Sequence, residues 1–270
     1  YKRPHGDLLI RAYIEPETTV GKGQDYDFQT IQGAIDSVRD GWRITVHDGT
    51  YYENVTVDKS VTIKSLSGPA KTIVQTSPPY SNNDVFRITA SCVTLSGFTI
   101  QSATYAGRAG VWLEDASGCV ISGNVILDNN YGIYVSESST SNIPLENECK
   151  YNVTGIYIDG SENCISGNKL HGNTAPIGSA IFLSSIASGN YIRFNTITVD
   201  PGTDPAVAAG PQLYNQSTEE VSAIENWWGT DSGPSNAGGQ GPVVGDTVLF
   251  DPWLAKQPVR VKTAAARAGP

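Results

Sequence analysis

One short segment recurs at a nearly constant interval along the chain, and this repeat limits the possible folds more than any other feature. The segment is a small residue followed by three apolar residues. It occurs as GVWL, GIYV, GIYI and AIFL, starting at Gly110, Gly132, Gly155 and Ala180. Successive starts are 22, 23 and 25 residues apart. A fixed interval of this size is typical of a chain built from stacked repeat units.

A second series interleaves with the first and consists of an Asn followed two places later by an apolar residue, at Asn124, Asn147, Asn168 and Asn195. Two or three short apolar segments per repeat are too short for helices and fit one coil of a parallel β-helix. Asn tolerates the left-handed backbone of a sharp bend, and stacked Asn side chains can form hydrogen-bonded ladders. We therefore predict an all-β, single-stranded, right-handed parallel β-helix of about eight coils with structural Asn residues.

Both ends of such a solenoid need a cover, because a terminal coil exposes apolar core and unpaired strand edges. Residues 27–38 place five apolar side chains on one helical face and precede Gly41, so we predict an N-terminal capping helix with Asp27 as its N-cap. The opposite end is predicted to be plugged by aromatic side chains, namely Trp227, Trp228, Phe250 and Trp253.

The domain organisation follows from this arrangement. We predict that residues 1–255 form one β-helix domain with both caps and that residues 256–270 are a linker or tail. The first full coil is expected to contain strands at 44–46, 55–57 and 61–63, with a turn at 47–50.

Charge and composition exclude some partners. Eighteen Lys and Arg against 27 Asp and Glu give a net charge of -9, which opposes binding to nucleic-acid phosphates. We expect no membrane span, since no apolar run reaches about 18 residues, and no signal-peptide pattern stands at the start. The four Cys stand singly without neighbouring His, so we predict buried free thiols and no metal site, at Cys92, Cys119, Cys149 and Cys164.

Several segments resemble a known family. They are FQTIQGAIDSV, ITVHDGTYYENVTV followed by VTIKS, the repeated SGN triplets, and ENWWGTDSGPS with DPWL. Together they are similar to the NosD-like, pectin-lyase-like group of right-handed parallel β-helix proteins, which is found on secreted and cell-surface proteins. The resemblance covers about residues 27 to 254 and implies the fold. It does not imply one activity, because the family includes polysaccharide lyases, hydrolases, esterases and epimerases as well as non-enzymatic sugar-binding modules.

The enzymatic signatures of this family that can be tested are absent. The chain has neither the NTD, DD and GHG motifs of polygalacturonase-like enzymes nor the DPH motif of alginate-epimerase-like enzymes. A His–Gly pair occurs at His171, but no acidic partners are apparent at matching positions in neighbouring coils. We therefore predict that His171 is a turn residue.

Strand alternation predicts a row of aromatic side chains on the surface. In the four repeated strands the residues that point outward are Trp112, Tyr134, Tyr157 and Phe182. At a strand spacing of roughly 4.8 Å the row would extend about 14 Å along one sheet. Such a row is a candidate platform for the apolar faces of sugar rings, so we predict these four residues to bind substrate. In the alternative, a loop or the C-terminal segment covers the row, or the rings only stabilise the sheet.

Charged residues are predicted beside this row and are the candidate catalytic residues. Arg87 would head the row from the preceding coil, and Glu114 and Asp159 would lie two coils apart, roughly 10 Å. Two carboxylates near that separation are typical of inverting hydrolysis. An Arg beside carboxylates could instead neutralise a uronate while its C5 proton is removed, with Ca²⁺ as the possible cofactor of such a lyase. Ordinary surface charge is the alternative interpretation.

Three functional hypotheses follow. The first is an extracellular or cell-surface β-helix module that recognises polysaccharide. The second is a polysaccharide lyase or glycoside hydrolase acting on an acidic polysaccharide, and the third is a non-catalytic structural spacer of a surface protein. We expect the chain to be secreted or at the cell surface, as a monomer or as part of a larger surface protein, with polysaccharide as its partner.

Overall fold

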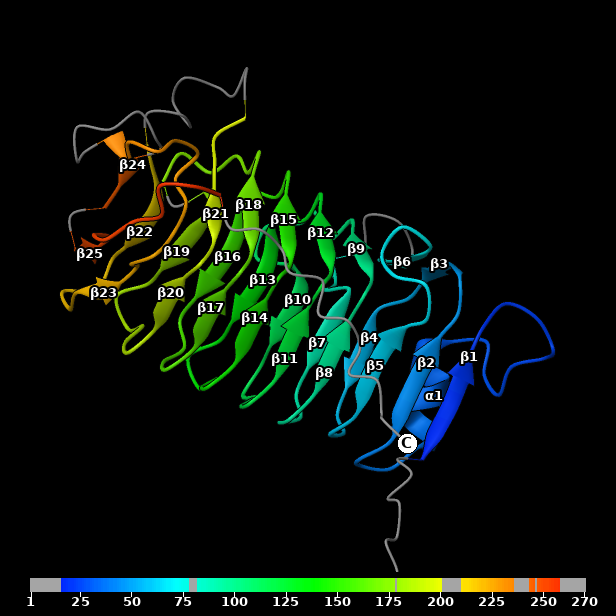
Figure 1. Cartoon of the computed structure of the whole chain (residues 1–270). Coiled ribbons are helices and arrows are strands. Elements are labelled where there is room, and N and C mark those ends of the chain that lie inside the picture. The colour runs from blue at the N-terminus through cyan, green and yellow to red at the C-terminus, as the bar shows by residue number, and fades with distance from the viewer. Residues whose placement is uncertain are drawn as a thin grey trace, which may run out of the picture.

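Short parallel strands stacked in three sheets make up almost all of the regular secondary structure (Figure 1). The structure is a computed structural model, and it describes residues 16–77, 82–177, 179–200, 210–235, 243–245 and 247–257. We call the ten-stranded sheet A, the seven-stranded sheet B and the eight-stranded sheet C. Along the chain, each coil contributes one strand to A, then one to B and then one to C. Sheet C has eight strands, in agreement with the predicted β-helix of about eight coils.

The strands are short, with two to five residues each. Sheet A contains β1 (Glu17–Val20), β2 (Arg43–Val46), β5 (Thr62–Ser65), β8 (Thr94–Ser96), β11 (Val120–Ser122), β14 (Ile143–Leu145), β17 (Cys164–Ser166), β20 (Tyr191–Arg193), β23 (Val221–Ser222) and β25 (Val248–Leu249). Sheet B contains β3 (Gly49–Tyr52), β6 (Thr72–Gln75), β9 (Thr99–Gln101), β12 (Val125–Leu127), β15 (Glu148–Lys150), β18 (Lys169–His171) and β21 (Thr196–Ile197). Sheet C contains β4 (Val55–Val57), β7 (Phe86–Ile88), β10 (Ala109–Leu113), β13 (Tyr131–Val135), β16 (Thr154–Ile158), β19 (Ile181–Leu183), β22 (Pro211–Asn215) and β24 (Val243–Val244).

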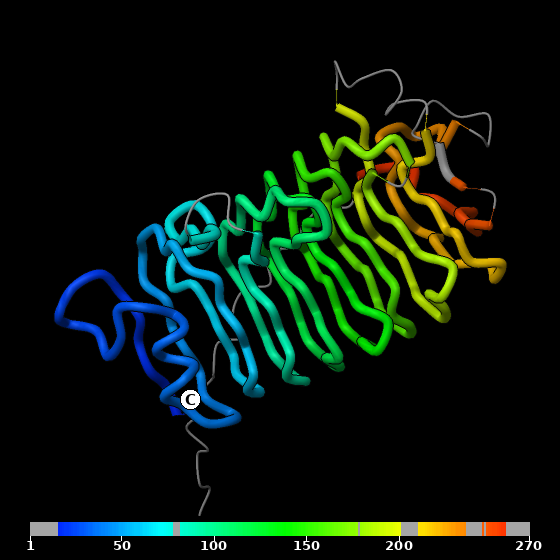
Figure 2. Tube along the Cα trace, turned by 180° about the vertical axis from the view of Figure 1, so that it is seen from behind, coloured from blue at the N-terminus to red at the C-terminus, as the bar shows by residue number. Residues whose placement is uncertain are grey.

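The core is a set of apolar columns inside the three sheets. In sheet B one column contains Ile100, Ile126, Cys149, Leu170 and Ile197, each in register with the next and fully buried. Burying one such aliphatic side chain contributes about 1.5–3 kcal/mol, so successive coils stabilise one another mainly through these columns. Figure 2 shows the coils following one another along a single axis.

Asn side chains form three hydrogen-bonded ladders at the three corners of the solenoid. All members of the ladders are at most 4% exposed. They are Asn124, Asn147, Asn168, Asn195 and Asn226 between sheets A and B, Asn129, Asn152 and Asn173 between sheets B and C, and Asn142, Asn163 and Asn190 between sheets C and A. The backbone N–H and Nδ2 of Asn147 both donate to Oδ1 of Asn168, at 2.9 and 3.1 Å. Nδ2 of Asn147 also donates to the carbonyl of Ile121 at 2.7 Å. The predicted ladder is confirmed.

The predicted left-handed backbone of these Asn residues is wrong. The residue before each one adopts it instead, as at Gly123 (φ 63°), Glu146 (φ 55°) and Gly167 (φ 68°). The left-handed residue bends the chain between two sheets, and the Asn that follows can point its amide inward.

The N-terminal cap is a short helix, α1 (Ile31–Ser37), as predicted in position but not in length. Its N-cap is Thr30, whose Oγ1 accepts a hydrogen bond from the backbone N–H of Gly33 at 3.2 Å. The prediction of Asp27 as N-cap is therefore wrong. The Asp27 carboxylate accepts hydrogen bonds from Thr18 and Thr19 and so ties its loop to β1. No helix in the described part of the chain has the length and apolar character needed to cross a membrane.

At the C-terminal end of the solenoid, Trp228 is fully buried, and Phe250 and Trp253 are partly buried against the core, which confirms the predicted plug at these residues. Trp227 is half-buried.

The first coil differs from the prediction, because β3 occupies part of the expected turn at 47–50 and the segment 61–63 begins the next coil. All four Cys are free, but only Cys119 and Cys149 are buried as predicted; Cys92 is exposed and Cys164 is half-buried. The predicted tail at 256–270 lies mostly outside the described residues, and the domain boundary stays a prediction.

Asn147→Ala should lower the free energy of unfolding by about 2–5 kcal/mol, because each buried polar group left without a partner costs about 1–3 kcal/mol. Urea unfolding followed by circular dichroism measures this loss. Asn83→Ala, which truncates an exposed Asn, is the matched control and should change stability by less than about 0.5 kcal/mol. Equal losses in the two variants would contradict a structural role for the ladder.

Candidate functional site

One column of outward side chains on sheet C is aromatic in five successive coils. We call this column the aromatic stripe, and its members, each in register with the next, are Trp112, Tyr134, Tyr157, Phe182 and Tyr214. They come from β10, β13, β16, β19 and β22, which lie side by side in Figure 1. The first four are the predicted substrate-binding residues, and the structure brings all of them together.

Neighbouring rings of the stripe are in contact along its whole length. Ring centroids are 4.4 Å apart for Trp112 and Tyr134, and 5.4 Å apart for Tyr134 and Tyr157. Tyr157 and Phe182 are nearly parallel, with centroids 4.8 Å apart, and Tyr214 follows Phe182 at 5.6 Å. All five side chains are half-buried, so each shares part of its ring with its neighbours and keeps part accessible to solvent.

The small residue at the head of each repeated strand has a steric cause. A Cβ on Gly132 would lie 2.4 Å from the carbonyl oxygen of Gly155 in the next coil. A Cβ on Gly155 would lie 2.7 Å from the carbonyl oxygen of Ala180. Only Gly allows the backbones to approach this closely, and the following residues then alternate regularly between core and surface.

Two aromatic residues of this face were missed by sequence reasoning. Tyr214 lies in the segment PQLYN, which lacks the small residue at the strand head and starts after a longer interval than the other repeats. Tyr131 precedes the small residue of its strand, and its ring contacts those of Tyr134 and Tyr157, with centroids 5.5 and 4.9 Å apart. The available signal for Tyr214 was the order of an apolar residue followed by an aromatic one, Leu213 and Tyr214, as in the four repeated strands.

Arg87 heads the aromatic stripe, as predicted, and its charge is already balanced. It lies in register with Trp112, and its guanidinium carbon is 5.0 Å from the Trp112 ring. Nε donates to Oε2 of Glu114 at 2.6 Å, a second donor contacts Oε1 of the same carboxylate, and Nη1 donates to Asp84 at 3.3 Å. The hydrogen bond to Glu114 raises the pKa of Arg87, so this guanidinium stays charged.

Asp159 also has a partner, because the hydroxyl of Tyr134 donates a hydrogen bond to its Oδ2. Burial, this hydrogen bond and the charge of Asp159 together raise the pKa of Tyr134. The phenol therefore remains protonated near neutral pH and acts as a donor rather than a base. The structure thus gives each of the two predicted catalytic carboxylates its own neighbouring partner.

A polar cleft of about 90 Å³ lies at the Arg87 end of the aromatic stripe. Its lining includes Asn54, Thr56, Asp84 and Arg108 as well as Arg87. The Asp84 carboxyl is 3% exposed and accepts a hydrogen bond from the backbone N–H of Ala109 at 2.9 Å. Its desolvation raises the pKa of Asp84 above the usual value despite the two nearby guanidiniums. The cleft is large enough for a substituent of a ligand.

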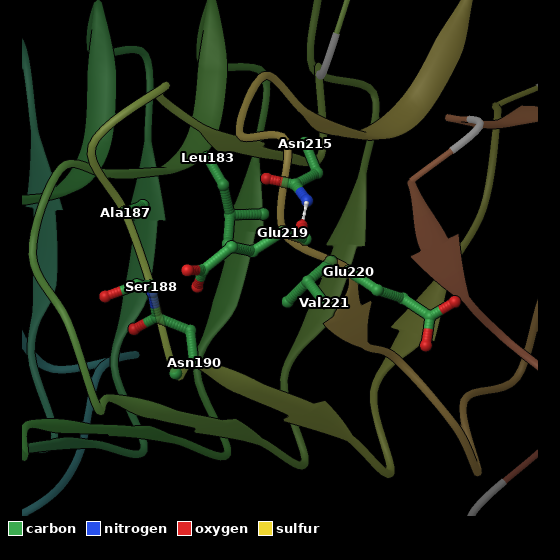
Figure 3. A pocket seen from close by; sticks show the side chains of 9 residues that line it. Leu183, Ala187, Ser188, Asn190, Asn215, Glu219, Glu220 and Val221 are labelled. Atoms are coloured by element: carbon green, nitrogen blue, oxygen red, sulfur yellow. Dashed lines mark hydrogen bonds between the residues drawn. The ribbon is translucent and has the colours of Figure 1, made fainter.

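A second hollow lies near the C-terminal end of sheet C, below the turn that follows β19 (Figure 3). In Figure 3 the amide of Asn215 points toward Glu219, and its Nδ2 donates to the carbonyl of Glu219 at 2.7 Å. The hollow measures about 10 Å³. This is close to the minimum volume of a single water molecule, so it is too small for a ligand.

A cluster of charged residues on sheet B was not predicted. Nε2 of His171 lies 3.0 Å from Oε1 of Glu148, and Nδ1 lies 3.1 Å from Oδ1 of Asp200. Lys169 donates to the same Oε1 of Glu148 at 2.9 Å. His171 is therefore the last residue of β18 with acidic partners on both sides, and its prediction as a partnerless turn residue is wrong. The parallel register of β15 and β18 places Glu148 opposite Lys169. This pairing depends on the number of residues in the coil that separates the two strands.

Glu148→Gln should lower stability near neutral pH and have little effect near pH 2. Burial alone would raise the pKa of Glu148, but the hydrogen bonds from His171 and Lys169 lower it from 4.5 to about 2. A carboxyl with a lowered pKa stabilises the fold above its unfolded pKa, and this contribution is lost as the pH falls from about 4.5 to about 2. Urea unfolding across this range measures the effect, with the exposed Glu137→Gln as control. A difference between variant and parent that does not change with pH would contradict it.

Comparison with solved structures supports the fold. An alginate lyase from Paenibacillus sp. str. FPU-7 superposes with a TM-score of 0.53 at 13% identity, covering 72% of this chain and 82% of that one. The pectate lyase Pel9A superposes with a TM-score of 0.52 at 14% identity, covering 88% of this chain and 76% of that one. Identities this low support a shared fold and carry no conclusion about activity.

Two sequence comparisons identify relatives. A cell surface glycoprotein of Methanothermus fervidus is 37% identical over 101 residues, which are 37% of this chain and 16% of that protein. The chain therefore matches only a small part of that relative's length. The family model described as periplasmic copper-binding protein (NosD) matches residues 26–221. Because this match spans well over half of the sequence, the chain belongs to the NosD family of parallel β-helix proteins.

Proposed function

We propose that the chain is a surface-located β-helix module that recognises polysaccharide through the aromatic stripe. The observation that supports this most is five half-buried aromatic rings in register along one sheet. Aromatic faces pack against the apolar faces of pyranose rings. A row of rings, rather than one ring, suits a polymer better than a single sugar.

The spacing of the rings also supports a polymeric ligand. Neighbouring centroids in the stripe are 4.4–5.6 Å apart, because the rings follow the strand spacing of the sheet. One hexose in an extended polysaccharide occupies about the same length. An extended chain lying parallel to the solenoid axis would therefore place about one sugar over each coil.

The names of the relatives support a location outside the cytoplasm. The family is described as periplasmic, and the relative from Methanothermus fervidus is named a cell surface glycoprotein. The match to only 16% of that protein fits a chain that acts as one part of a larger surface protein. We accordingly place the module in the secreted or surface-exposed fraction, as a monomer or a segment of such a protein.

The copper ion in the family's description does not fit the described residues. In the described ranges no group of three or more His, Cys, Asp or Glu is placed to hold a metal ion, and this applies equally to the Ca²⁺ expected of a lyase. Cys119 and Cys149 are buried, and burial raises the pKa of both thiols, which disfavours the thiolate form that binds copper. The proposed function therefore uses no metal.

Tyr157→Ala and Tyr134→Ala should each weaken binding to the recognised polysaccharide by roughly two- to tenfold, since one aromatic contact contributes about 0.5–1.5 kcal/mol. Tyr134→Phe keeps the ring and should retain most of the affinity. Affinity gel electrophoresis with a polymer chosen from a glycan array measures the change. Tyr191→Ala removes a 59% exposed Tyr from sheet A and is the control. Equal effects of Tyr191→Ala and Tyr157→Ala would contradict the stripe as binding face.

A second candidate is catalysis on a polysaccharide. It is supported by the position of Glu114 and Asp159 beside the stripe, two coils apart, with Arg87 at its head. The hydrogen bonds from Arg87 and Tyr134 occupy these carboxylates, which suits positioning roles better than proton transfer. We therefore place this candidate second.

If the chain is an enzyme, it should release reducing ends or unsaturated uronates from an acidic polysaccharide. Glu114→Gln and Asp159→Asn should then each reduce the rate by about a hundredfold or more, because a general acid or base contributes about 10²–10⁴. Absence of product from a broad panel of polysaccharides would exclude this candidate. If binding were also absent, a structural spacer would be the remaining hypothesis.

A further inference from the structure

The surface around the aromatic stripe carries charged side chains whose balance bears on the ligand. The carboxylates are Asp84 in the cleft, Glu114 beside the first ring and Asp159, which accepts a hydrogen bond from the hydroxyl of the second ring, Tyr134. The two guanidiniums are Arg87 and Arg108, both at the N-terminal end of the stripe. These five groups carry a net charge of -1, and the whole chain carries -9.

Both guanidiniums already have carboxylate partners. Arg87 contacts Glu114 through two donors and Asp84 through a third. Arg108 lies 3.9 Å from the same Asp84 carboxylate and donates through Nε to Oδ1 of Asn82 at 2.8 Å. A ligand carboxylate arriving at Arg87 would have to displace Glu114 or share the guanidinium with it.

Beyond Arg87, none of the five residues of the stripe carries a positive charge that could neutralise the carboxylates of a bound polymer. The next positions are occupied by Trp112, Tyr134, Tyr157, Phe182 and Tyr214, and the carboxylate of Asp159 stands beside this part of the stripe. A uronate polymer in an extended conformation would place about one negative charge over each coil of this surface. Like charges at such distances repel one another, more strongly near a protein surface than in bulk water.

We propose that the aromatic stripe selects neutral polysaccharides and discriminates against uronate polymers. This inference rests on the proposed function. It is supported by the net negative charge of the groups around the stripe and by the absence of charge on its five rings. Hydroxyl groups of a neutral sugar can accept from Arg87 and Arg108, whose side chains are 36% and 29% exposed, without breaking the existing ion pairs. The cleft of about 90 Å³ would admit a substituent such as a hydroxymethyl group.

Matched polymers that differ only in charge test this inference. A soluble glucan, mannan and galactan are each compared with the derivative in which primary hydroxyls have been oxidised to carboxylates. Binding to the purified chain is measured by affinity gel electrophoresis at low and at high salt, with Tyr157→Ala included to show that binding uses the stripe. We expect the neutral form to bind at least about tenfold more tightly at low salt and the difference to shrink as salt screens the charges.

Two outcomes separate this inference from the proposed function. Tighter binding of the oxidised form, lost in Tyr157→Ala, would overturn selectivity for neutral polymers and leave the binding face intact. Absence of binding to every polymer of the panel, acidic and neutral, would overturn both.

A charge variant provides a second measurement. Glu114→Gln releases Arg87 from its carboxylate partner and should improve binding of the oxidised polymers relative to the neutral ones by severalfold. Glu146→Gln changes the net charge by the same amount at the corner between sheets A and B and should leave this ratio unchanged. Equal ratios in the two variants would show that local charge does not set selectivity.

Discussion

The register between successive coils is the constraint on which the rest of the molecule depends. Parallel hydrogen bonds align equivalent residues of neighbouring strands, and the Asn ladders hold the same alignment at the three corners. Because a slip of one residue would turn every core side chain outward and break the buried amide bonds, the coils have one favoured alignment. The same alignment that stacks Ile and Val inside stacks aromatic rings outside.

The repeat pattern was sufficient to predict the β-helix and four of the five rings of the stripe, and the helical spacing of apolar residues in 27–38 predicted the capping helix. These features follow from local periodicity, which the sequence displays directly. Tyr214 and the acidic partners of His171 could not be predicted in the same way, because they depend on how many residues each corner contains. The left-handed backbone fell on the residues before each Asn, as at Glu146, since the amide must point inward to reach the next coil.

The charged side chains show a different limit of sequence reasoning. Strand alternation placed Arg87, Glu114 and Asp159 on the correct face, but periodicity says nothing about which side chain reaches which partner. The structure joins Arg87 to Glu114 and Tyr134 to Asp159. These pairings change the chemical expectation, because a carboxylate that is already ion-paired or hydrogen-bonded is less available as a general acid or base.

The corner ladders also bear on how such a chain can evolve in length. Within a ladder, each Asn except the last donates to the Asn of the coil that follows and accepts from the coil before it, so the upper and lower faces of a coil complement each other. A tandem duplication of one coil would therefore insert a unit that matches both neighbours at three corners. Every insertion of this kind among the coils from β10 to β22 would add one more ring to sheet C, so the aromatic stripe can lengthen in whole steps.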